Sequence, residues 1–371
     1  MPATDMKIMA AVARSPRTPL QLEQLDLESP RDDEVLIRMT AVGICHTDMA
    51  MRDQLFPVPQ PIVLGHEGAG VVEAVGKSVG KLSPGDHVVV SYASCGNCRN
   101  CHIGKPSYCA DFFACNFAGR RTDGTSALRS GTETIHSHFF GQSSFATYAV
   151  ADARNVVKVT KDVPLELLGP LACGIQTGAG AVMNSLNMAV GSSLVVIGAG
   201  SVGLSAVMAA RLMDATTIVA VDLQAERLEL ARTLGATHTL MPDRMDLAGA
   251  LREIIPGGAQ YVLETTGIPE VIQLGVESLA PLGVCGLLGA PGLDSEIRLN
   301  VAHLMTAGRS VRGIIEGDSV PEVFIPALIE FYEQGKLPFD KIVTYFPFEK
   351  INEAMDAMER QRVIKPILRM A

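Results

Sequence analysis

The apolar residues in the first part of the chain come in short alternating runs that are broken by Gly and Pro. Examples are residues 34–39, 70–76 and 87–90. Runs of this length with a period of two are typical of short strands that are buried on one face. The pattern predicts a β-rich domain over residues 1 to about 155.

From about residue 175 to 312 the pattern changes to apolar strand-like runs that alternate with longer helical segments. Residues 194–197 and 217–221 are two such β-branched runs, and an Ala/Met/Leu-rich segment without Pro separates them. This alternation predicts a doubly wound parallel sheet, and hence a mixed α/β protein.

Two further helices are expected near the C-terminus, over residues 320–334 and 348–360. We expect this tail to return to the first domain. The predicted organisation is a split catalytic domain, residues 1–174 and 313–371, with a nucleotide-binding domain inserted over residues 175–312.

A glycine-rich turn follows the first apolar run of the inserted domain. Gly198, Gly200 and Gly203 have the G-x-G-x-x-G spacing, and Asp222 ends the second run about twenty residues later. The glycines allow a tight turn, close approach of a pyrophosphate and close helix packing, while the helix N-terminus attracts phosphate. Asp222 would accept hydrogen bonds from the adenine ribose and repel a 2′-phosphate, and Leu223 cannot bind one, so NAD is favoured over NADP. The competing interpretation is a packing turn that ends in a surface acid.

Composition excludes several classes of protein. The chain has 371 residues, 47% hydrophobic and 19% charged, and a net charge of −9 without a basic block, which argues against disorder and against nucleic acid as a partner. The start of the sequence does not resemble a signal peptide. Residues 167–210 carry no charge, but Gly, Pro, Gln and Asn interrupt them, which favours a buried strand with helices over a membrane span. A cytoplasmic location is expected.

Four of the eight cysteines lie close together on one loop. Two residues separate Cys95 from Cys98 and Cys98 from Cys101, and Cys109 follows after seven more. Four thiolates at this spacing fit a closed tetrahedral zinc site, whose role would be structural because no position is left for a substrate. Iron–sulfur ligation is the alternative, although its cysteine spacings usually differ.

Three other candidate ligands are scattered along the chain. They are Cys45 after Gly-Ile, His66 in Gly-His-Glu, and Cys173 in Leu-Ala-Cys-Gly. Each has an ordinary alternative, since cysteine is often a small buried residue and a lone histidine is usually structural. Sequence spacing alone does not unite the three.

The segment from Gly65 to Gly70, followed by Gly76 and Val79, resembles the signature of the zinc-containing alcohol dehydrogenases of the medium-chain dehydrogenase/reductase family. The Gly-Ile-Cys-His-Thr-Asp segment at 43–48, the four-cysteine lobe, the segment at 171–174 and the nucleotide turn also occur in the family's order. The resemblance covers essentially the whole chain. It implies a GroES-like catalytic domain, a Rossmann domain and an active site in the cleft between them.

The same resemblance implies a catalytic zinc. Cys45, His66 and Cys173 would hold it, and its fourth position would take water or the substrate alcohol; alcohol dehydrogenase is itself a standard example of this ligand set. Asp48 would orient His66, and Glu67 would lie near the metal as a transient ligand. A second, structural zinc would sit on the four cysteines.

The proton of the alcohol would leave through Thr47, whose hydroxyl both accepts and donates. Many relatives continue this relay to a histidine at the position of Ala50, so the relay must end differently in this chain, in water or at His46. The cofactor-binding residues implied by the resemblance are His46, Thr177, Gly198, Gly200, Ser201, Val202, Gly203, Asp222, Arg227, Thr266, Leu288 and Lys365. For Arg227, a solvated helix charge is the competing interpretation.

The segment after the four-cysteine lobe resembles the branch that contains glutathione-dependent formaldehyde dehydrogenase and aryl-alcohol dehydrogenases. Phe113 stands where the glutathione users carry an arginine, which replaces an anion partner by an apolar face. We therefore predict oxidation of a benzyl-alcohol-like aromatic primary alcohol to its aldehyde. Phe112, Phe113 and Phe117 could equally be core residues, and Glu316 would either favour a polar substituent or face water.

Two alternatives remain at this point. In the first, the chain is an enzyme whose substrate is S-(hydroxymethyl)glutathione or an aliphatic alcohol. In the second, the chain is a zinc- and nucleotide-binding member of the family without turnover. The expected partners are a small alcohol or aldehyde and further copies of the chain, as a homodimer or homotetramer joined through the nucleotide-domain sheets. No nucleic acid or membrane partner is expected.

Overall fold

The computed structural model describes residues 6–242 and 247–370, and these divide into two compact units. The chain passes from the first unit to the second after Cys173. It returns at Val320 and makes one short further excursion into the second unit at Gln334–Phe339. The sequence pattern placed the return at residue 313; the segment up to Ser319 belongs to the second unit because it packs on that unit's first helix.

The first unit contains two sheets and few helices. One sheet has five strands in the order β4-β1-β2-β7-β8, and the other has seven, in the order β10-β6-β5-β3-β18-β17 with β9 paired to β3. The bounds are β1 Met6–Ala13, β2 Gln21–Leu27, β3 Glu34–Gly43, β4 Ile62–Val63, β5 Glu67–Val75, β6 His87–Val90, β7 Leu128–Ser130, β8 Glu133–Ile135, β9 Tyr148–Asp152, β10 Val156–Lys158, β17 Val343–Pro347, β18 Lys365–Arg369, α1 His46–Arg52, α2 Arg99–His102, α3 Phe112–Phe117, α10 Pro321–Glu333 and α11 Ile351–Glu359.

Strand β3 organises the seven-stranded sheet. It pairs with β5 along most of its length, with β9 near its start and with β18 near its end. Its last residue, Gly43, lies opposite Glu67, the first residue of β5. The residues that follow β3 and precede β5 therefore meet at one end of the sheet.

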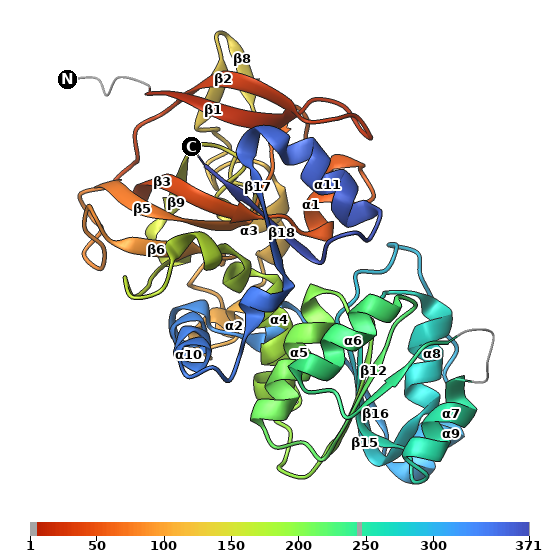
Figure 1. Cartoon of the computed structure of the whole chain (residues 1–371). Coiled ribbons are helices and arrows are strands. Elements are labelled where there is room, and N and C mark those ends of the chain that lie inside the picture. Colours follow the sequence, from red (N-terminus) through yellow and green to blue (C-terminus); the bar gives the residue numbers. More distant parts are fainter. Residues whose placement is uncertain (1–5, 243–246, 371) are drawn as a thin grey trace. The chain divides into compact units, whose positions relative to one another are not determined.

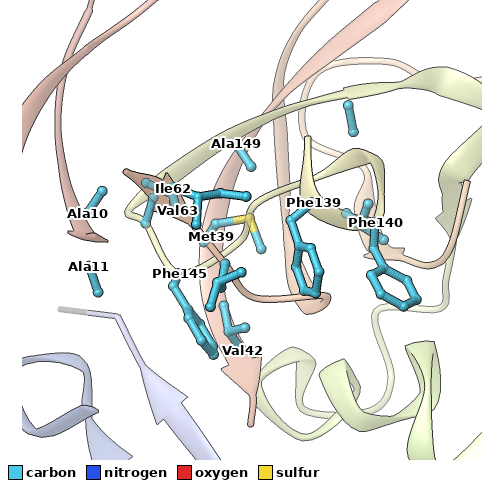
Figure 2. Packing of buried hydrophobic residues seen from close by; sticks show 14 of the residues in the cluster. Ala10, Ala11, Met39, Val42, Ile62, Val63, Phe139, Phe140, Phe145 and Ala149 are labelled. Carbon is cyan, nitrogen blue, oxygen red and sulfur yellow. The ribbon is translucent and has the colours of Figure 1, made fainter. Parts of the chain in front are cut away.

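Apolar side chains from both sheets form the core of the first unit. Figure 2 shows part of it, where Met39 and Val42 of β3 lie near Phe139, Phe140 and Phe145. The rings of Phe139 and Phe140 are 5.0 Å apart in an edge-to-face arrangement, which is a favoured geometry for aromatic pairs. This core fixes the backbone segments that carry the polar residues of the site.

The second unit is a doubly wound parallel sheet, as the alternating pattern predicts. Its six strands follow the order β13-β12-β11-β14-β15-β16, the arrangement of dinucleotide-binding folds. Right-handed crossovers place α5 and α6 on one face and α7, α8 and α9 on the other (Figure 1). The bounds are α4 Gly174–Gly180, β11 Ser193–Ile197, α5 Ser201–Leu212, β12 Thr217–Val221, α6 Ala225–Leu234, β13 His238–Leu240, α7 Leu247–Ile254, β14 Ala259–Glu264, α8 Pro269–Glu277, β15 Leu279–Leu287, α9 Val301–Ala307 and β16 Ser310–Gly313.

No helix in residues 6–242 or 247–370 combines the length and the apolar character needed to cross a bilayer. The uncharged stretch 167–210 instead forms short turns, α4, the buried strand β11 and most of α5.

Candidate functional site

Two groups of potential metal ligands form within the described residues. One is Cys95, Cys98, Cys101 and Cys109, and the other is Cys45, His66, Glu67 and Cys173. Within each group, the ligand atoms all lie within 4.8 Å of one another. The three scattered residues that sequence spacing could not unite are therefore neighbours in space.

The register of the seven-stranded sheet explains why Cys45 meets His66. Cys45 lies two residues after β3, His66 immediately precedes β5, and the ends of these two strands are paired. Cys173 arrives on a tight turn, Gly169–Ala172, that packs on the same strand ends. A Cβ atom on Gly169 would lie only 2.4 Å from the carbonyl oxygen of Glu67, so glycine is required for this approach.

Asp48 connects the first two ligands. Its Oδ1 lies 2.8 Å from Nδ1 of His66, and its Oδ2 accepts a hydrogen bond of 2.9 Å from the backbone N–H of Cys45. Burial opposes a charge on His66, but the Asp48 carboxylate outweighs it and raises the pKa of the imidazole well above its ordinary value. The contact to Nδ1 leaves Nε2 as the nitrogen for a metal, and metal binding there would displace its proton.

Glu67 and Lys365 form a buried ion pair next to the ligands. Nζ of Lys365 lies 2.7 and 2.9 Å from the two carboxylate oxygens of Glu67 and donates a third hydrogen bond to the carbonyl of Ile44. Although burial alone would lower it, the pKa of Lys365 is raised, because the Glu67 carboxylate stabilises the ammonium. All three donors of the ammonium thus have partners, so a contact with pyrophosphate would require Lys365 to leave at least one of them.

Thr47 and His46 lie on the first turn of α1. Oγ1 of Thr47 is 3.6 Å from Sγ of Cys45, which places its hydroxyl beside the ligand cluster. His46 is exposed on the same turn, and Ala50 one turn further is half-buried and has no ionisable group. The Thr47 hydroxyl thus lies where the predicted proton path would begin, and the path itself stays a prediction.

A chain of aromatic rings leads away from His66. The ring of Phe140 stacks on the imidazole with centroids 4.5 Å apart, and the ring of Phe117 lies 5.2 Å from that of Phe140. Phe113 follows at 5.6 Å from Phe117 and is 69% exposed, while Phe112 is buried in the core. The predicted pocket residue Phe113 is thus linked to the ligand cluster through two other rings.

The four-cysteine lobe has the features of a thiolate site. Backbone N–H groups donate to sulfur from Cys95 and Asp111 to Cys109, at 3.2 and 3.4 Å, and from Ala110 to Cys98, at 3.4 Å. The donation from Ala110 is the main reason that the pKa of Cys98 is lowered to about 6. Such donors stabilise charged sulfur, while burial raises the pKa of Cys109 to about 12 and also raises that of Cys101.

Both groups fit a metal ion by the chemistry of their donors. All eight cysteines lie in the described part of the chain and none is in a disulfide. Nε2 of His66 is buried and has no hydrogen-bond partner among the described residues, although the sulfurs of its group are near. Tetrahedral zinc with bonds of about 2.3 Å would hold sulfurs about 3.8 Å apart, which is compatible with both clusters.

The glycine turn of the second unit has the expected geometry. Gly198 has a φ of +99°, which favours glycine. A Cβ on Gly203 would lie 1.8 Å from the carbonyl oxygen of Gly198, whereas a Cβ on Gly200 would meet nothing within 4 Å. Gly198 therefore allows the turn, Gly203 allows close packing of α5, and Gly200 leaves the approach to the turn open. Ser201 and Val202 are the first residues of α5.

Asp222 follows β12 and binds the turn. Its two oxygens accept hydrogen bonds from the backbone N–H groups of Ala199, at 2.7 Å, and Gln224, at 2.9 Å. Nη1 of Arg227 is 3.9 Å from Asp222, and Nε of Arg227 is buried without a hydrogen-bond partner in the described chain. The arginine side chain is 14% exposed, so a fully solvated helix charge does not describe it.

The other predicted cofactor residues are fixed by two buried carboxylates. Glu316 accepts hydrogen bonds from Gln176, at 3.2 Å, and Thr177, at 3.3 Å, and is 7% exposed, which shows that the interpretation of Glu316 as facing water is wrong. Glu264 accepts a hydrogen bond of 2.7 Å from the backbone N–H of Thr266. The backbone carbonyl of Glu264, and not its carboxylate, accepts a hydrogen bond of 2.9 Å from the backbone N–H of Leu288.

Sequence reasoning missed several residues that support these sites. Phe140 and Gln142 contact His66, and Ser91 contacts the segment before Cys173. None of them belongs to a spacing pattern. The one available signal was the Phe-Phe-Gly sequence at 139–141, which interrupts an otherwise polar segment before β9.

Comparisons with known proteins agree with this geometry. A family model for the alcohol dehydrogenase GroES-like domain matches residues 31–161, and one for zinc-binding dehydrogenases matches residues 201–334. The chain is 48% identical over 361 residues to a geraniol dehydrogenase from Castellaniella defragrans, which covers 97% of this chain and 96% of the relative.

Two solved structures are similar over nearly the whole chain. The benzyl alcohol dehydrogenase of Acinetobacter calcoaceticus is 47% identical with a TM-score of 0.96, covering 99% of this chain and 100% of that chain. An alcohol dehydrogenase zinc-binding domain protein from Burkholderia ambifaria is 52% identical with a TM-score of 0.97, with the same two coverages.

Proposed function

Since the chain belongs to the zinc-containing medium-chain alcohol dehydrogenase family, we propose that it oxidises aromatic primary alcohols of the benzyl-alcohol type. The products would be the aldehyde, NADH and a proton, and the reaction is reversible. The observation that carries this proposal is the meeting of Cys45, His66 and Cys173 at one sheet end, with the ring of Phe140 stacked on His66.

Each residue of the ligand cluster has a role in the proposal. When bound, zinc lowers the pKa of an alcohol at this site and the nicotinamide ring accepts a hydride. Cys45, His66 and Cys173 would hold the metal, and Asp48 keeps Nε2 of His66 directed at it. Thr47 would take the alcohol's proton, because its hydroxyl can accept one proton and donate its own.

The Glu67–Lys365 pair would set the charge beside the metal. Nζ of Lys365 donates hydrogen bonds to both carboxylate oxygens of Glu67 and so fixes the position of this carboxylate. A transient contact between Glu67 and the metal would require this pair to open. Because the ion pair is fully buried, breaking it on one side alone would leave an uncompensated charge.

Two zinc ions per chain and NAD are the proposed cofactors. The four-cysteine lobe would hold the structural ion with all four positions filled by protein. NAD is favoured because the Asp222 carboxylate stands at the end of β12, where a 2′-phosphate would meet like charge. Nη1 of Arg227 lies 3.9 Å from that carboxylate and forms an ion pair with it.

The aromatic substrate class is supported by the rings beside His66. Phe140, Phe117 and Phe113 offer apolar faces, and the described α3, which carries two of them, contains no cation that could bind a glutathione carboxylate. The structural similarity to a benzyl alcohol dehydrogenase is in accord with this assignment.

An allylic alcohol such as geraniol is a second candidate, favoured by the 48% identity to a geraniol dehydrogenase. In both benzyl alcohol and geraniol the carbinol carbon is bonded to an sp² carbon. The adjacent π system stabilises the charge that develops when hydride leaves. One pocket of apolar aromatic side chains would suit either molecule.

Initial rates of NADH formation would test the proposal. NAD is supplied with benzyl alcohol, geraniol, ethanol or, separately, formaldehyde plus glutathione, and zinc is measured in the same preparation. We expect the largest kcat/KM for benzyl alcohol. A preference for the glutathione mixture or for ethanol would refute the substrate class, and no NADH from any alcohol together with one zinc per chain would favour a binding protein without turnover.

We further propose a homo-oligomer joined through the second unit, working in the cytoplasm. Strand β16 ends the six-stranded sheet, and the exposed side chains of Leu282, Val301 and Met305 lie in the elements next to it. An edge strand flanked by exposed apolar residues is a natural place for two copies to pair. Light scattering in solution would distinguish a dimer or tetramer from the 39.4 kDa monomer.

A further inference from the structure

Gln142 lies in a backbone segment with unusual geometry next to the ligand cluster. His138, Phe140 and Ser143 all have positive φ values, of 62°, 51° and 54°, although none of them is glycine. Such conformations cost free energy and persist only where the surrounding contacts enforce them. Gln142 itself is 2% exposed, so its amide must find its hydrogen-bond partners inside the protein.

The side-chain amide of Gln142 connects His66, which precedes β5, to the end of β6. Its Nε2 donates to the carbonyl oxygens of His66, at 2.9 Å, and Val90, at 2.8 Å. Its Oε1 accepts a hydrogen bond of 3.1 Å from the backbone N–H of Gly68. These partners fix which end of the amide is which, since nitrogen faces carbonyls and oxygen faces an N–H group.

Ser91 extends this support to the segment before Cys173. It directly follows Val90, and its hydroxyl donates a hydrogen bond of 2.8 Å to the carbonyl oxygen of Ala172. Ser91 is fully buried. The end of β6 is therefore connected to the backbone of His66 through Gln142. Through Ser91 it is connected to Ala172, the residue before Cys173.

This support is distinct from that of Asp48. Asp48 contacts the imidazole ring of His66, whereas Gln142 contacts the backbone of His66 and Ser91 contacts the segment before Cys173. Rigid support of ligand backbones matters because a metal site loses affinity when its ligands must be brought together on binding.

We propose that Gln142 and Ser91 are positioning residues that hold His66 and Cys173 in their metal-binding arrangement. The inference rests on the proposed catalytic zinc. Replacing Gln142 by an apolar residue leaves the buried carbonyl of His66 and the N–H of Gly68 without this partner, and the His66 backbone is then free to move. The hydrogen bonds of Gln142 and Ser91 given above lead to His66, Gly68, Val90 and Ala172 and not to the four cysteines, so the metal of the four-cysteine lobe should be unaffected.

The test compares zinc release from the Gln142→Leu, Ser91→Ala and Ser144→Ala proteins with that from the wild type. Ser144 is the matched control, because its hydroxyl is equally buried and has no hydrogen-bond partner in the described residues. A colorimetric chelator follows the two zinc ions as separate phases, and the phase that is absent from the Cys173→Ser protein identifies the catalytic site. Cobalt substitution gives a second readout, the absorption spectrum of the site.

We expect Gln142→Leu to speed release of the catalytic zinc by about 10- to 100-fold and Ser91→Ala by roughly 3- to 10-fold. The other phase and both phases of Ser144→Ala should stay within about twofold of the wild type, by the independence of distant sites. Equal acceleration of both phases, no acceleration, or the same effect from Ser144→Ala as from Ser91→Ala would overturn the proposal. If Gln142→Leu does not fold, Ser91→Ala decides. A wild-type protein with one zinc would instead refute the proposed function.

Discussion

The two candidate metal sites of the first unit are assembled in different ways. The four cysteines of the lobe lie within one short loop, Cys95 to Cys109, and are stabilised by N–H groups of the same loop. The other ligands, Cys45, His66 and Cys173, come from three separate segments and meet because β3 and β5 are paired and the turn Gly169–Ala172 packs on the ends of these strands. The lobe is a local structure, whereas the second site depends on the whole sheet.

This difference predicts that the two metal sites have different roles. A closed set of four thiolates stabilises its loop and has no position for a substrate. A three-ligand site that is held by the surrounding sheet can keep a position open, because the protein and not the metal maintains its geometry. Changes at the two sites should therefore separate turnover from stability.

The largest effect is expected from Cys173→Ser. Loss of this ligand should lower kcat by about 1000-fold or more, since the metal provides several kcal/mol of charge stabilisation. NAD binding should persist, because the nucleotide turn lies in the other unit. Steady-state kinetics and NAD fluorescence titration measure the two effects. Cys115→Ser, outside both clusters, is the control, and unchanged turnover in Cys173→Ser would remove this residue from the metal site.

Cys101→Ser should have the opposite profile. Loss of a structural metal ligand is expected to lower the free energy of unfolding by roughly 3 to 5 kcal/mol and the unfolding temperature by roughly 10 °C. At 20 °C the folded fraction should keep kcat within about threefold of the wild type. Calorimetry and kinetics on one preparation check this. A large loss of kcat with unchanged stability would contradict the structural role.

Asp222→Gly tests the nucleotide site without touching either metal site. Removing a charged hydrogen-bond acceptor worth roughly 1.5 to 3 kcal/mol should reduce the preference for NAD over NADP by about 10- to 100-fold. Because Asp222 also binds the backbone N–H of Ala199, some loss of stability is expected as well. Ratios of kcat/KM with the two cofactors measure the effect. An unaltered ratio would exclude Asp222 as the discriminating residue.

The smallest effect is expected from Glu34→Gln. This change removes the carboxylate that interacts with His138, two residues before Phe140. Burial disfavours the charge of Glu34, but His138 and Arg121 outweigh it and lower its pKa to about 2. A lowered pKa stabilises the fold at pH values above the ordinary value near 4.5, and this contribution is lost as the pH falls toward 2.

We expect the wild type to exceed Glu34→Gln in free energy of unfolding by roughly 2 kcal/mol at pH 7, a value reduced for solvent screening. The difference should shrink between pH 4.5 and 2. Urea unfolding at several pH values measures it. A difference that does not depend on pH would show that the ion pair with Arg121 is not its source.

The same contrast explains what the sequence could predict. The four-cysteine lobe and the glycine turn are local, so spacing alone identified Cys95 to Cys109 and the βα turn at Gly198. The strands of the first unit and the parallel sheet followed from hydrophobic periodicity. The Cys45, His66 and Cys173 cluster required family resemblance, because the β3–β5 register and the packing of the turn before Cys173, both long-range features, bring these residues together.

Other features depend on long-range packing and left no sequence signal. Gln142 and Ser91 reach their partners across a sheet, and the pairing of Lys365 with Glu67 joins residues from opposite ends of the chain. The chain's return to the first unit at Val320 instead of residue 313 depends on the packing of the Glu316 turn against α4.

The most direct test of this account is stepwise zinc removal from the wild-type protein. Aliquots are withdrawn from a chelator at intervals, and zinc content, turnover of benzyl alcohol and unfolding temperature are measured on each. The account predicts that turnover falls in proportion to one zinc while the unfolding temperature follows the other. A joint fall of both quantities with a single zinc, or turnover that survives loss of both ions, would contradict it.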